Sequence, residues 1–136
     1  MTKTYLDHED IAHLAHGVRE AIVNSGYMGM KCYPIPRGGV AAAYAIYTLH
    51  DCPFVIVSTP EEADFFIDDI IDSGTTMRRY CDEFPGKPFF ALIDKLNGER
   101  EDEWLVFPWE VTNQGSDESA TDIVTRLLQY VGEDPN

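Results

Sequence analysis

The sequence predicts an α/β fold, with a parallel β-sheet flanked by helices. Short apolar runs rich in β-branched or aromatic residues alternate with helical segments along most of the 136-residue chain, a pattern typical of parallel sheets. The length is enough for one compact domain and too short for two. Hydrophobic residues make up 44% of the chain and charged residues 25%, which are ordinary values for a folded protein.

The first element is a helix near the N-terminus. Asp7 is suited to cap its start and Gly26 to end it. Its apolar residues follow the helical spacing of i, i+3, i+4 and i+7, and they are Ile11, Leu14, Ala15, Val18 and Ile22.

Strands and helices then alternate. The predicted strands are residues 30–35, 54–58, 64–68, 88–93 and 104–107. The predicted helices are residues 40–49, which are rich in alanine, residues 75–84, and a final amphipathic segment marked by Ile123, Val124, Leu127, Leu128 and Val131. Ligands of such sheets bind at the carboxyl ends of the strands, so functional residues are expected there.

The net negative charge of the chain disfavours some classes of binding partner. Ten Lys and Arg against 24 Asp and Glu give a net charge of -14, which disfavours binding to nucleic acid or to an anionic membrane. No apolar run approaches the length of about 18 residues that spans a bilayer, and the N-terminus lacks a signal peptide. We therefore expect a cytoplasmic protein whose partners are small molecules.

The most informative stretch is Phe65-Phe66-Ile67-Asp68-Asp69-Ile70-Ile71-Asp72-Ser73-Gly74-Thr75-Thr76. An apolar strand leads into two adjacent carboxylates, and a third carboxylate precedes a turn that opens a helix. Gly74 permits close backbone approach, and the amides and hydroxyls of Ser73, Thr75 and Thr76 are donors for a phosphate.

The alternative is an ordinary capped turn with solvated acids. Adjacent carboxylates repel each other, so a pair beside a phosphate cradle needs a reason. Sugar hydroxyls or Mg²⁺ would supply one.

This stretch resembles the phosphoribosyl diphosphate (PRPP) binding motif of type I phosphoribosyltransferases. Two other segments agree with the resemblance, which covers roughly residues 9–112. Tyr33-Pro34-Ile35-Pro36-Arg37-Gly38-Gly39-Val40 resembles the pyrophosphate loop of the family. Lys95 with Trp104-Leu105-Val106-Phe107-Pro108-Trp109-Glu110 is similar to the base-binding part of the xanthine-guanine and hypoxanthine branch.

The resemblance implies the type I phosphoribosyltransferase fold with a small hood region, and it implies roles for the PRPP-binding residues. Asp68 and Asp69 would bind the ribose hydroxyls, directly or through Mg²⁺. Asp72 would contact N7 of the purine as a general base. The 5′-phosphate would be bound by Ser73, Gly74, Thr75 and Thr76. The diphosphate would face the catalytic Arg37 and the amides of Gly38 and Gly39.

Further roles concern the purine. Lys95 would donate to the 6-oxo group and so exclude adenine. Trp104, with Val106 on the same strand, would contact the purine ring. Trp109 could equally well contact the ring or pack in the core. Glu110 would hold a second Mg²⁺ or bind the 2-amino group of the base.

The function that follows is a Mg²⁺-dependent purine phosphoribosyltransferase acting on guanine, xanthine or hypoxanthine, and the resemblance implies a dimer or tetramer. Residues 59–63 are short and acidic where many family members have a longer closing loop. This difference keeps a second hypothesis open, a non-catalytic PRPP- or nucleotide-binding regulator. An orotate or adenine enzyme is disfavoured by Lys95 together with Trp104.

The extent of the resemblance, roughly residues 9–112, predicts the domain organisation. Residues 1–112 are predicted to form the phosphoribosyltransferase domain, and residues 113–136 a linker and a C-terminal helix. The tail, Arg126 onward, is also similar to the opening segment of GTP cyclohydrolase I, so this helix either packs on the domain or remains from a fusion.

Overall fold

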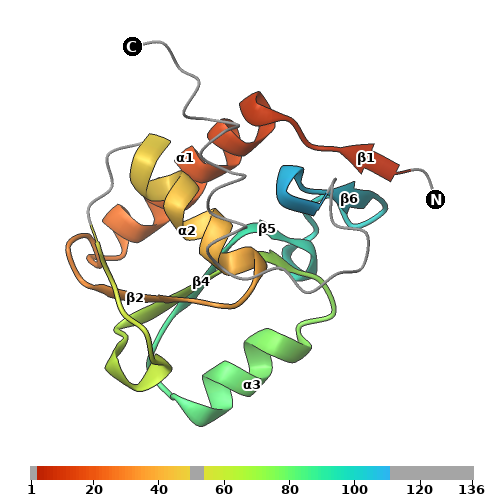
Figure 1. Cartoon of the computed structure of the whole chain (residues 1–136). Coiled ribbons are helices and arrows are strands. Elements are labelled where there is room, and N and C mark those ends of the chain that lie inside the picture. Colours follow the sequence, from red (N-terminus) through yellow and green to blue (C-terminus); the bar gives the residue numbers. More distant parts are fainter. Residues whose placement is uncertain (1–2, 50–53, 111–136) are drawn as a thin grey trace.

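A four-stranded parallel sheet lies at the centre of the protein (Figure 1). The computed structural model describes residues 3–49 and 54–110. The strands lie in the order β3 (Val55–Ile56), β2 (Lys31–Pro34), β4 (Phe65–Ile71) and β5 (Phe89–Asp94), and every neighbouring pair is parallel. The predicted fold class, a parallel sheet flanked by helices, is therefore confirmed.

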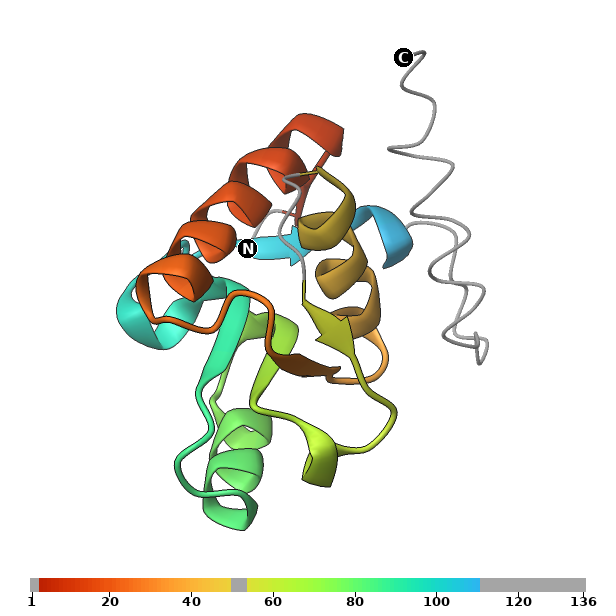
Figure 2. The ribbon, with the colours of Figure 1, turned by 90° about the vertical axis from the view of Figure 1, so that its left-hand side faces the viewer.

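Helices cover both faces of this sheet (Figures 1 and 2). α1 (His8–Asn24) and α2 (Gly38–Leu49) lie on one face, and α3 (Thr75–Glu83) lies on the other. The start of α1 is fixed as predicted, because Asp7 and Asp10 form a reciprocal capping box with each other's backbone N–H groups. Gly26 follows the helix end with a φ of 83°.

Strand β4 supplies side chains to both layers of the core. Phe65 is buried in the cluster beneath α1 and α2, while Phe66 is buried against Tyr80 and Phe84 on the α3 side. This alternation is what the period of two in a strand requires. Burial on both faces explains why β4 begins with three consecutive apolar residues, which made it recognisable in the sequence.

The strand predicted at residues 104–107 does not join the main sheet. β6 (Trp104–Val106) pairs instead with β1 (Lys3–Tyr5), and the two form a small parallel sheet of their own beside the main one (Figure 1). β1 was not predicted from the sequence. This small sheet is the hood region of the predicted fold.

The features predicted near the C-terminus cannot be compared with the structure. The C-terminal helix, the linker before it and the boundary at residues 112 and 113 lie outside the described residues. Among the described helices, none has the length and apolar character needed to cross a membrane.

Candidate functional site

A cavity of about 310 Å³ lies at the carboxyl ends of β2 and β4. It brings together two predicted segments that are some thirty residues apart in the chain. The first segment contributes Arg37 and Gly38, and the second contributes every residue from Asp68 to Thr76. Pro36, Met77 and Phe89 complete the lining. Met77 and Phe89 belong to no motif and could not be predicted from the sequence.

Asp68 and Asp69 lie within β4, whereas the third acid of the cavity, Asp72, directly follows it. The predicted strand ended at Asp68, but pairing of Ile70 with Ile93 and of Ile71 with Asp94 continues β4 to Ile71. Both carboxylates of the pair are therefore held by the sheet. Because the paired backbone is fixed, the two carboxylates cannot move far apart.

Burial gives the Asp68 and Asp69 pair unusual protonation behaviour. Asp68 is 9% exposed, and its carboxylate accepts the backbone N–H of Asp69 at 2.8 Å. Desolvation, followed by the charge of Asp69, raises the pKa of Asp68 to about 8. Burial also raises the pKa of Asp69. The pair is thus poised either to share a proton or to bind a cation.

The loop after β2 packs tightly against these acids. A side chain at Gly38 would overlap the Asp69 carboxylate, and one at Gly39 would overlap the Ile67 carbonyl oxygen. The Gly39 N–H donates to the Ile35 carbonyl at 2.8 Å, so the protein already engages this predicted diphosphate donor. The Pro36–Arg37 peptide bond is cis.

The turn from Ser73 to Thr76 has the geometry of an anion cradle. Gly74 adopts a left-handed conformation with a φ of 88° and caps the start of α3. The first amides of a helix have no partner within it, and here the Thr75 N–H donates to the Ser73 hydroxyl at 3.4 Å. The Ser73 and Thr75 hydroxyls lie 3.0 Å apart. The Arg78 guanidinium donates to the Ser73 carbonyl oxygen at 3.2 Å. Arg78 is a further cation at the cradle; its position one helical turn after Gly74 was the available signal.

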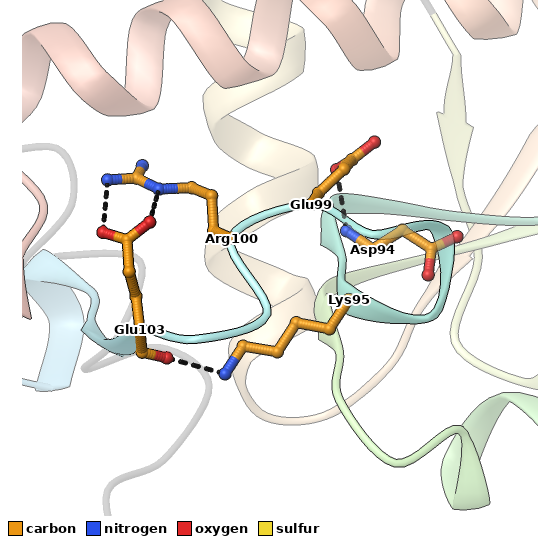
Figure 3. Close-up of polar contacts among 5 residues, drawn as sticks. All are labelled: Asp94, Lys95, Glu99, Arg100 and Glu103. Carbon is orange, nitrogen blue, oxygen red and sulfur yellow. Dashed lines mark hydrogen bonds and ion pairs between the residues drawn. The ribbon is translucent and has the colours of Figure 1, made fainter. Parts of the chain in front are cut away.

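Lys95 and Asp72 lie beside each other. Lys95 begins the 3-10 helix that follows β5, and its ammonium lies 3.7 Å from the Asp72 carboxylate. The Lys95 side chain is 13% exposed, whereas that of Asp72 is 74% exposed. The same ammonium donates to the Glu103 carbonyl oxygen at 2.7 Å (Figure 3). The predicted base-selecting lysine and the predicted general base are therefore neighbours.

Neither Lys95 nor the other predicted base contacts line the cavity. Trp104 is 51% exposed, and the Lys3 ammonium lies 4.5 Å from the centroid of its ring. Val106 lies beside Tyr5 in the hood. Trp109 is buried, and its indole N–H lies within 3.4 Å of the Asp69 carboxylate. Of the two tryptophans, Trp109 is thus the one that contacts the acids.

Glu110 has a local backbone partner. Its carboxylate accepts the Phe107 N–H at 2.8 Å, and burial raises its pKa. Within the described residues, no group of three or more His, Cys, Asp or Glu is arranged to hold a metal ion.

Asp68 and Asp69 nevertheless fit Mg²⁺. This ion is commonly bound by one or two carboxylates together with substrate oxygens. A cation would also offset both the burial and the mutual repulsion that raise the pKa of Asp68.

Three solved structures share this arrangement of strands and helices. A hypothetical protein from Neisseria gonorrhoeae with bound ppGpp is 15% identical, with 97% of each chain covered and a TM-score of 0.59. The Helicobacter pylori xanthine-guanine-hypoxanthine phosphoribosyltransferase is 14% identical, covering 81% of this chain and 93% of that chain, with a TM-score of 0.55. A purine phosphoribosyltransferase from Pyrococcus horikoshii is 18% identical, covering 88% and 100%, with a TM-score of 0.55.

The chain has the type I phosphoribosyltransferase fold. No family model matches its sequence, and no curated protein matches it either. In this fold, the cavity described above lies at the end of the sheet where parallel α/β proteins bind their ligands.

Gly74→Ala tests the phosphate cradle. A methyl group there would meet the Leu96 side chain at 2.6 Å in a backbone conformation that disfavours alanine. We expect loss of PRPP binding, measured by calorimetry, and a fall in stability of about 1 kcal/mol. Gly86→Ala is the matched control, because Gly86 has a φ of 89° with open space around it. It should lose stability through backbone strain alone and keep PRPP binding; equal binding losses in both variants would contradict the assignment.

The Asp68 pKa predicts the pH dependence of stability. Folded Asp68 keeps its proton up to a pKa of about 8, against an ordinary value of 3.8, so the folded state binds more protons between these values. The free energy of unfolding should therefore fall as pH rises through this window. Thermal melting should show the fall without Mg²⁺, and Mg²⁺ should reduce it. Asp68→Asn should remove most of the slope, whereas Asp82→Asn, on the exposed surface of α3, should retain it.

Proposed function

We propose that this chain is a Mg²⁺-dependent phosphoribosyltransferase that transfers the phosphoribosyl group of PRPP to guanine, xanthine or hypoxanthine and releases pyrophosphate. The observation that carries the proposal is the single cavity that joins the Arg37–Gly38 loop to the whole stretch from Asp68 to Thr76. The purine phosphoribosyltransferases among the structures of the same fold support it. We further propose a cytoplasmic dimer or tetramer that acts on small molecules.

The cavity provides a distinct environment for each end of PRPP. The first amides of α3, with the Thr75 and Thr76 hydroxyls, would bind the 5′-phosphate. Arg37 and the Gly38 amide would face the diphosphate, whose negative charge grows as the bond from C1 to oxygen breaks. Asp68 and Asp69 would hold Mg²⁺ and the ribose hydroxyls. When bound, the ion would neutralise charge on the departing pyrophosphate.

The base end would use Asp72 and Lys95. As C1 acquires oxocarbenium character, the purine nitrogen forms the new bond to C1, and Asp72 accepts the proton that the purine loses at N7. The Lys95 ammonium donates to the 6-oxo group. An adenine amino group at that position is itself a donor and would offer the lysine no acceptor. The 3.7 Å separation of Lys95 and Asp72 supports a role for both at one edge of the base.

Turnover with each base tests the proposal. Spectrophotometric assays with saturating PRPP and Mg²⁺ should show product from at least one 6-oxopurine. Asp72→Asn should lower kcat about 100-fold, the usual scale of general acid–base catalysis, with little change in PRPP affinity. Lys95→Ala should mainly weaken base selection. No turnover with any 6-oxopurine would refute the proposed enzyme activity. Equal losses of kcat and of base selection in both variants would show that the roles of Asp72 and Lys95 are misassigned.

A second candidate function is a nucleotide-binding regulator without turnover. Residues 59–63 contain the 3-10 helix Pro60–Glu62, and the Lys87 ammonium donates to the Pro60 and Glu61 carbonyls at 3.2 and 3.1 Å. A connection that is short, acidic and anchored in this way is poorly suited to close over an anionic substrate. The ppGpp bound to the Neisseria gonorrhoeae protein adds support for nucleotide binding.

Calorimetry separates the two candidates. A regulator should bind guanosine monophosphate or ppGpp tightly and form no product when PRPP, Mg²⁺ and a 6-oxopurine are supplied together. Efficient turnover in the same preparation would exclude the regulator.

A further inference from the structure

The loop that joins β5 to β6 is closed by its own hydrogen bonds (Figure 3). The Asp94 N–H donates to the Glu99 carboxylate at 2.9 Å, and the Gly98 N–H donates to the Lys95 carbonyl at 3.1 Å. At the far end of the loop, the Glu103 N–H donates to the Arg100 carbonyl at 3.1 Å. These bonds give the loop a defined shape without any ligand.

Arg100 and Glu103 form an ion pair within this loop. The Arg100 guanidinium donates through two nitrogens to the two Glu103 carboxylate oxygens, at 2.8 and 3.1 Å (Figure 3). Such a two-bond pair fixes direction as well as distance. Hydrogen bonds from Arg100 lower the pKa of Glu103, so the carboxylate stays charged.

The backbone at Arg100 is unusual for its residue type. Its φ of 49° makes it the one described residue other than glycine with a positive φ. An arginine in this left-handed conformation costs more than a glycine would. The surrounding contacts must hold it there, and an outlier of this kind is a reason to look for a role of the side chain.

The Glu103 residue links this pair to the candidate site. While its carboxylate is held by Arg100, its carbonyl oxygen accepts the Lys95 ammonium at 2.7 Å. The Asp72 carboxylate is farther from the ammonium, at 3.7 Å. The Lys95 ammonium therefore lies between the Glu103 carbonyl and Asp72, and it is closer to the carbonyl.

We infer that Arg100 and Glu103 are positioning residues for Lys95, because their ion pair fixes the carbonyl oxygen that orients the ammonium and thereby sets how strictly the site prefers a 6-oxo to a 6-amino purine. The inference rests on the proposed function for the identity of the ligand. Without the pair, the loop loosens and Lys95 moves toward Asp72, where the two charges neutralise each other and the ammonium no longer faces the base.

Arg100→Gly tests the inference without breaking the backbone, since glycine favours the φ that this position adopts. Calorimetry with guanosine monophosphate and adenosine monophosphate measures the preference whether or not the chain turns over. We expect the ratio of the two affinities to fall at least about tenfold, as loss of a hydrogen bond to a charged group does, while PRPP affinity stays unchanged. Glu103→Gln, which retains the carbonyl and loses the charge pair, should behave in the same way.

Two further variants make the test specific. Glu101→Gln removes one charge from an exposed residue of the same loop and should leave the ratio unchanged. In a Lys95→Met background, Arg100→Gly should cause no further change in the ratio, because the pair acts through Lys95.

The outcomes separate this inference from the proposed function. A wild-type chain that prefers the guanosine nucleotide but gives no product refutes the enzyme and leaves the inference standing. An Arg100→Gly variant that retains the preference overturns the inference, as does one whose effect persists in the Lys95→Met background. A wild-type chain that binds both nucleotides equally, or neither, also overturns it.

Discussion

The structure depends on one constraint, which is that two adjacent carboxylates, those of Asp68 and Asp69, are held together within strand β4. Pairing of β4 with β5 fixes the backbone of Asp68 and Asp69, and Gly38 leaves the space that the second carboxylate occupies. Repulsion and desolvation make this arrangement costly unless a proton, a cation or hydroxyl donors offset it. A binding site would explain this cost, because a bound ligand or cation would offset it.

The cavity is consistent with this constraint because its two ends differ in character. Acids line the part next to β4, and the start of α3 presents backbone amides a few residues further along the chain. A ligand that has hydroxyl groups and a bound metal at one side and a phosphate at the other would satisfy both ends. A sugar phosphate has this distribution, which is why the chemistry of the cavity and its place in the fold lead to the same class of ligand.

The sequence was sufficient where the signals were local. The apolar stripe and Asp7 predicted α1 correctly, and the strand, the acids and the glycine turn predicted the cavity lining because they are consecutive. Contacts between distant segments were not predictable in this way. The pairing of β1 with β6 joins residues about a hundred positions apart and has no local pattern. For the same reason the approach of Trp109 to Asp69 could not be distinguished from ordinary core packing.

The most direct test is a crystal structure of the chain with guanosine monophosphate. The account predicts that the phosphate lies against the amides at the start of α3, that the ribose hydroxyls face Asp68 and Asp69, and that the 6-oxo group accepts from Lys95. A nucleotide bound outside this cavity would contradict the account, as would one bound in it with its phosphate away from the start of α3.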